Sequence, residues 1–149
     1  MKSFIERSNR FAVASVISLS VWIVANIINV VLVLLTMGFA SGNDVFIEAF
    51  GFILLFSAAF SLPGIIIFWV VFLANYDSKN LFMVLLITAL ITSALSVLLL
   101  MLWIGGNDLG SAGLFVSAVI SAIAAVIIHV SVFNQIVEKQ NEEEPCIEL

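Results

Sequence analysis

Charged residues, cysteine and histidine are all scarce in this chain, and each scarcity excludes a class of protein. Only 10% of the 149 residues are charged, whereas a soluble domain has about 25%. The single cysteine, Cys146, excludes an intramolecular disulfide and the enzymes that work through paired thiols. Together with the single histidine, His129, it cannot supply the roughly four ligands of a structural zinc site. We therefore expect no metal site and no cofactor, and the absence of a basic patch argues against nucleic-acid binding.

Hydrophobic residues are abundant instead, at 63% of the sequence. Four runs carry no Lys, Arg, Asp or Glu: residues 11–43, 49–76, 80–107 and 109–137. Each exceeds the roughly 20 residues that a helix needs to cross a bilayer, and none alternates with the two-residue period of a membrane barrel. The sequence therefore predicts an all-α integral membrane four-helix bundle over residues 1–137, with helices at about 11–38, 46–74, 81–104 and 111–137.

The positions of the basic residues predict the orientation of the chain in the membrane. All of them fall before the first helix, between the second and third, or after the fourth: Lys2, Arg7, Arg10, Lys79 and Lys139. With four crossings, these three places share one side of the bilayer. Basic loops stay in the cytoplasm, so both termini are predicted to be cytoplasmic. The compactness of the chain favours a bacterial plasma membrane.

The acidic residues concentrate at the end of the chain. Five of the ten Asp and Glu residues lie within residues 138–149. The net charge of −5 therefore belongs largely to a tail and not to a face that steers a substrate. Such a polar, acidic segment is expected to be disordered on its own.

The two predicted outer loops resemble each other. Residues 42–44 and 106–108 both read Gly-Asn-Asp, 64 residues apart, which is compatible with two tandem helical hairpins. Chance is the alternative, because Gly, Asn and Asp are ordinary turn residues. Asp44 and Asp108 could face each other and attract cations at the outer mouth, but we favour their capping the helices that follow.

Few polar side chains lie inside the predicted spans, and three of them are candidates for a polar path. Asn26 and Asn29 share one face of the first helix. They either line a route for a substrate or hold neighbouring helices together, and we favour the second. His129 could relay protons, but we favour a hydrogen bond to a neighbouring helix or contact with interfacial water.

Small residues recur at helical spacing in the third and fourth helices. The ridges consist of Gly113, Ser117, Ser121 and Ala125 in the fourth helix and of Thr88, Thr92 and Ser96 in the third. Small side chains let two helix backbones approach closely in a membrane. These ridges therefore either close the bundle or join subunits of an oligomer.

Pro63 and Gly64 interrupt the middle of the second helix. Proline removes a backbone hydrogen bond and clashes with the preceding turn, so a kink is expected there. The kink either gates a pathway or gives the helix a static shape, and we favour static shape.

These features favour a non-enzymatic membrane component that associates with itself or joins a larger membrane complex. The alternative is a small channel or transporter subunit whose polar path includes Asn26, Asn29 and His129. A membrane enzyme acting on lipid ranks last, because the spans hold no plausible acid/base pair. The expected partners are the lipid bilayer and a second copy of the chain or another membrane protein, and no substrate can be named.

Overall fold

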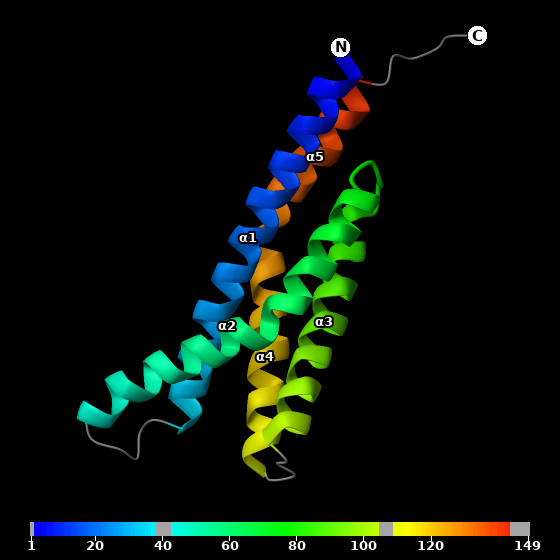
Figure 1. The fold of residues 1–149 in the computed structure, drawn as a ribbon. Helices are drawn as coiled ribbons and strands as arrows, with labels where there is room; N and C mark the ends of the chain where they lie inside the picture. Colours follow the sequence, from blue (N-terminus) through cyan, green and yellow to red (C-terminus); the bar gives the residue numbers. More distant parts are fainter. Residues whose placement is uncertain (1, 38–42, 105–108, 144–149) are drawn as a thin grey trace.

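The described residues of the chain are all helical or turn. The computed structural model describes residues 2–37, 43–104 and 109–143, which contain five α-helices and no strand. Figure 1 shows α1 (Lys2–Met37), α2 (Asn43–Ala74), α3 (Leu81–Ile104), α4 (Leu109–Ile128) and α5 (Val130–Glu143). The all-α prediction is thus confirmed for the described residues. The physical reason is that a helix satisfies the backbone N–H and C=O groups of an apolar run internally.

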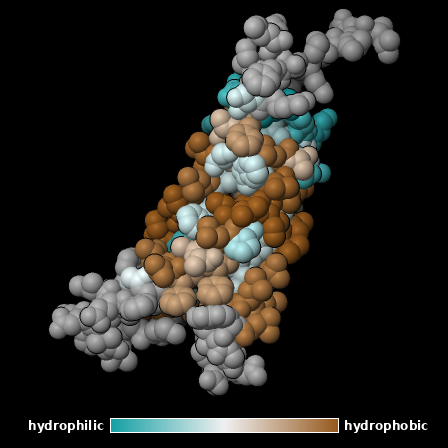
Figure 2. All heavy atoms as spheres, in the orientation of Figure 1, coloured by the Kyte–Doolittle hydropathy of each residue, from teal (hydrophilic) through white to brown (hydrophobic). Residues whose placement is uncertain are grey.

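Three or four stretches are long and apolar enough to cross a membrane. Three are continuous, namely Ser8–Leu35, Leu54–Ala74 and Leu81–Leu102. A fourth arises if the bent pair Gly113–Ile128 and Val130–Lys139 counts as one span. Figure 2 shows hydrophobic surface over the middle of the visible face and hydrophilic residues near the end that holds the α2–α3 turn. The chain is therefore consistent with a helical membrane bundle.

The helices contact one another in a ring. α1 packs on α2 and α4, and α3 packs on the same two helices, while α5 contacts α3 and α4. The N-terminal end of α1, the α2–α3 turn and α5 gather at one end of the molecule (Figure 1). Arg10 of α1 pairs there with Asp77 of the turn at 2.5 Å. Its guanidinium also lies over the ring of Tyr76, 5.5 Å from the centroid.

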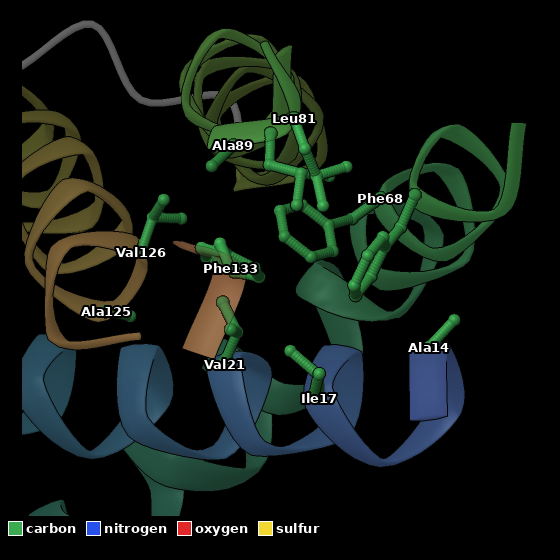
Figure 3. Close-up of a cluster of buried hydrophobic side chains, with 11 residues drawn as sticks. Ala14, Ile17, Val21, Phe68, Leu81, Ala89, Ala125, Val126 and Phe133 are labelled. Atoms are coloured by element: carbon green, nitrogen blue, oxygen red, sulfur yellow. The ribbon is translucent and has the colours of Figure 1, made fainter. Parts of the chain in front are cut away.

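A hydrophobic cluster fills the same end of the ring (Figure 3). All five helices contribute to it. Its members are Ala14, Ile17, Val21, Phe68, Phe72, Leu81, Leu85, Ala89, Ala125, Val126 and Phe133. The Phe72 and Phe133 rings meet edge to face, with centroids 5.8 Å apart. This cluster anchors α5 to the rest of the chain.

The fourth predicted helix differs from the observed structure at His129. One helix was expected over 111–137, but α4 and α5 meet at a bend of 43°. The His129 N–H bonds to the Val126 carbonyl at 3.1 Å, and its Nδ1 atom lies 2.8 Å from the Ala125 carbonyl. A carbonyl can only accept, so Nδ1 donates, and the side chain replaces the backbone N–H at that acceptor. The helical hydrogen-bond ladder is interrupted at this point.

The helix bounds differ from the prediction at both ends of the chain. α1 begins at Lys2, well before residue 11, and α5 continues to Glu143, so the first part of the predicted tail is helical. Residues 144–149 lie outside the described residues. So do Asp108 and the side chain of Asp44, and the cation-site and capping hypotheses for these two aspartates remain predictions.

Candidate functional site

A cavity of about 380 Å³ lies between α1, α2, α3 and α4. Figure 1 shows that α2 bends about halfway along its length, and Pro63 lies within this helix. Beyond the bend, the N-terminal half of α2 diverges from α3 (Figure 1). The cavity is lined on the α2 side by residues from Phe56 to Phe68. The bend and the cavity therefore occupy the same level of the bundle.

Asn26 organises a cluster of polar groups at the cavity wall. Its Oδ1 atom accepts a hydrogen bond from Ser57 Oγ of α2 at 2.7 Å. Its Nδ2 atom donates to the Trp22 carbonyl at 2.9 Å, within α1, and lies 3.4 Å from Ser61 Oγ. Trp22 Nε1 donates to the same Ser61 hydroxyl at 2.8 Å. The cluster thus joins one turn of α1, from Trp22 to Asn26, to one turn of α2, from Ser57 to Ser61.

Asn29 extends this cluster from α2 to α4. Its Nδ2 atom donates to Ser57 Oγ at 3.0 Å, and its Oδ1 atom accepts from Ser117 Oγ at 3.1 Å. Interhelical hydrogen bonds in membrane proteins contribute on average about 0.6 kcal/mol each. The structure therefore brings the two predicted asparagines together, and three helices share one hydrogen-bonded network.

The small-residue ridges lie inside the chain. Ser117, Ser121 and Ala125 are all buried and belong to α4, which packs on α1. Thr88 and Thr92 of α3 are also buried. Ser96 of α3 is half-buried, and Gly113 of α4 is the exposed member of these ridges.

Gly64 marks the close approach of α2 to α3. A Cβ atom at this position would lie 3.3 Å from Ser96 Oγ and 3.4 Å from the Cβ of Thr92. The hydroxyls of Thr92 and Ser96 bond to carbonyls of their own helix, so they leave this face of α3 available for packing. Gly113 of α4 differs, because it is exposed and nothing lies within 4 Å of a Cβ built there.

His129 occupies a separate place between α1 and α4. Its Nε2 atom lies 2.9 Å from Ser20 Oγ. With Nδ1 donating to the Ala125 carbonyl, a neutral ring accepts the Ser20 proton at Nε2. His129 is not among the described residues that line the cavity. The predicted path through Asn26, Asn29 and His129 is therefore not one continuous cavity wall.

Three residues of the site were not selected from the sequence as site residues. Ser57 and Ser61 supply the α2 side of the cluster, and Ser18 of α1 lines the cavity with its hydroxyl buried. One signal was present, because Ser18, Trp22 and Asn26 follow at intervals of four residues and share a helix face. Ser57 and Ser61 also lie four residues apart on one face of α2. This spacing does not mark them as partners of Asn26, since helical serines commonly bond to their own backbone.

The chemistry of the cavity is that of neutral hydrogen bonding. Its described lining consists of amides, hydroxyls, one indole and hydrocarbon, with no ionisable side chain among them. General acid/base catalysis needs a titratable group placed near the substrate, and the described wall offers none. Comparison with known protein families, curated proteins and solved structures finds no match to this chain.

Proposed function

We propose that the chain crosses a plasma membrane four times, with both termini in the cytoplasm. The apolar helices support insertion. The orientation is supported by the basic residues Arg10, Lys79 and Lys139, which belong to the three segments gathered at one end of the molecule (Figure 1). The ion pair between Arg10 and Asp77 also joins two of these segments. Protease or label accessibility of the termini in sealed inverted vesicles tests this orientation.

Within that membrane, we propose that the protein is a non-enzymatic component of the carrier or channel type, which takes up a small molecule from the bilayer into the cavity. The network of Asn26 and Asn29 beside an open space carries this proposal. Polar side chains are costly at membrane depth and are usually retained for function.

The position of two aromatic rings supports entry from the lipid side. Phe56 and Phe60 of α2 both line the cavity and stack with centroids 6.4 Å apart. Phe56 is 36% exposed and also lines the cavity, which supports an opening of the cavity on this side of α2. An apolar molecule dissolved in the membrane can approach between α2 and α3 without crossing a charged group among the described residues.

Trp22 provides the test, because its indole lines the cavity. The variant Trp69→Phe with Trp103→Phe retains Trp22 as the only tryptophan and is reconstituted in phospholipid vesicles. Titration with 1-bromododecane, a neutral heavy-atom quencher, should give a saturable component of Trp22 quenching. Ala118→Phe, which places a ring in the cavity, should abolish that component, while the matched change Ala59→Phe at an exposed position should preserve it.

Linear quenching of equal slope in all three proteins would mean that Trp22 meets the quencher only by collision in the bilayer. That result would exclude uptake into the cavity. Circular dichroism and monodisperse elution of the reconstituted variants establish that the added rings have not unfolded the chain.

Association with a second copy or a larger complex is a second candidate. The observation that favours it is Gly113, a small exposed residue on α4 beside the exposed Val116. The protein mass of the nanodisc-reconstituted particle tests it, with Gly113→Leu as the variant. Ser117 and Ser121 are unsuitable positions, because both are buried within the chain. A monomeric wild type would exclude self-association, and the search would then turn to a partner that co-purifies from native membranes.

A further inference from the structure

Ser18 has a hydroxyl whose environment differs from that of the other described buried groups. The residue is 2% exposed and lines the cavity, yet Ser18 Oγ is the buried side-chain oxygen without a hydrogen-bond partner among the described residues. At comparable depth, Ser121 donates to the Ala118 carbonyl of its own helix, and Ser117 donates to Asn29 Oδ1. A buried hydroxyl without a partner is unfavourable. The residue lines the cavity, although this oxygen has almost no accessible surface of its own, so rotation of the side chain about its Cα–Cβ bond would turn the hydroxyl towards a partner that occupies the cavity.

The hydrophobic cluster borders the cavity beside Ser18. Val21, Phe68 and Ala89 belong both to this cluster and to the cavity lining, and Figure 3 shows them on α1, α2 and α3. A molecule whose polar group reaches Ser18 therefore has that group near the part of the wall that belongs to this cluster. The remainder of the molecule must extend along the wall towards Phe60, on the side where α2 diverges from α3.

The rest of the wall is suited to hydrocarbon. The amides of Asn26 and Asn29 and the hydroxyls of Ser57 and Ser61 bond to one another, so they present little unpaired polarity to the cavity. No described lining residue is ionisable. A charged ligand would lose its hydration without gaining a counterion, which is strongly unfavourable.

We infer that the cavity binds a neutral, lipid-soluble molecule with a largely hydrocarbon body and one hydroxyl or carbonyl group, and that the Ser18 hydroxyl is the hydrogen-bond partner of that group. This inference rests on the proposed uptake function and specifies its ligand class. The cavity volume of about 380 Å³ falls within the range of roughly 300–1,000 Å³ that is usual for small-molecule sites.

The test uses four probes with the same chain: 1-dodecanol, dodecane, dodecanoate and dodecyltrimethylammonium. Each competes with 1-bromododecane for the saturable quenching of Trp22 in the single-tryptophan protein, at matched mole fractions in the membrane. We expect 1-dodecanol to compete best. In Ser18→Ala, its competition should weaken by roughly two- to tenfold, the equivalent of one neutral hydrogen bond, while dodecane is unaffected.

The matched control is Ser15→Ala on the same helix, whose hydroxyl bonds to the Phe11 carbonyl and does not line the cavity. We expect Ser15→Ala to leave the competition by 1-dodecanol and the competition by dodecane unchanged. A general structural effect of losing a hydroxyl from α1 would change the competition by dodecane and by 1-dodecanol together. Loss of a specific hydrogen bond would change the competition by 1-dodecanol alone.

Two results would overturn the inferred ligand class while leaving uptake intact. One is equal competition by dodecane and 1-dodecanol with no response to Ser18→Ala, and the other is stronger competition by either charged probe. A complete absence of saturable quenching in the parent protein would instead refute the proposed uptake itself. Failure of the ligand class and failure of the function are thus separate outcomes.

Discussion

The network around Asn29 yields a quantitative prediction about stability. Asn29 makes two interhelical bonds, to Ser57 at 3.0 Å and from Ser117 at 3.1 Å. At about 0.6 kcal/mol for each bond, Asn29→Ala should lower the free energy of unfolding by roughly 1.2 kcal/mol. Removing the amide also enlarges the cavity, so this figure is the contribution of the hydrogen bonds alone.

A double-mutant cycle isolates the Asn29–Ser57 bond from the effect of the enlarged cavity. The assay is reversible unfolding by sodium dodecyl sulfate in mixed micelles, followed by circular dichroism, for Asn29→Ala, Ser57→Ala and the double variant. We expect a coupling energy of about 0.6 kcal/mol. Asn134→Ala is the matched control, because Asn134 is exposed on α5, and its stability should be unchanged.

A coupling energy indistinguishable from zero would refute the predicted contribution of the Asn29–Ser57 bond to stability. It would mean that the two side chains do not stabilise the folded chain through their mutual bond. Their proximity would then be a by-product of helix packing.

Three further predictions concern other parts of the chain. Ser18→Ala should raise the unfolding free energy by about 1 kcal/mol in ligand-free micelles, because it removes a buried hydroxyl without a partner; destabilisation in the same unfolding assay would contradict this. Gly64→Val should be less stable than Gly51→Val by roughly 1–3 kcal/mol, since only Gly64 lies against α3; equal unfolding midpoints would exclude a tight α2–α3 contact. Arg10→Gln should cost at most about 1 kcal/mol, and less in high salt, because the pair with Asp77 is solvent-exposed; a loss that persists at 1 M salt would show that the ion pair is not the cause.

The sequence alone was sufficient to predict the approximate positions of the long apolar helices. Runs of more than about 20 uncharged apolar residues have few alternatives to a helix in a membrane. The observed ends of α2 and α3, Ala74 and Ile104, match the predicted ends. Helix ends outside the apolar runs were less predictable: α1 and α5 continue into polar segments, where hydrophobicity no longer marks a boundary.

The break at His129 depended on tertiary structure. Nothing in the local sequence interrupts a helix there, since neither proline nor glycine is present near the position. The break accompanies two side-chain contacts, one to the Ala125 carbonyl and one to Ser20 of α1. The second of these partners lies 109 residues away in the chain, so it is set by how α1 packs on α4.

The polar site was also predictable from the sequence only in part. The shared helix face of Asn26 and Asn29 follows from their spacing, because the helical repeat places residues three apart on one side. Their partners depend on how the helices assemble, since Ser57 and Ser117 come from two other helices. The burial of Ser117 and Ser121 inside the chain also depends on this assembly. A ridge of small residues permits close approach to any helix, and the partner is selected by the shape and hydrogen bonds of the assembled bundle.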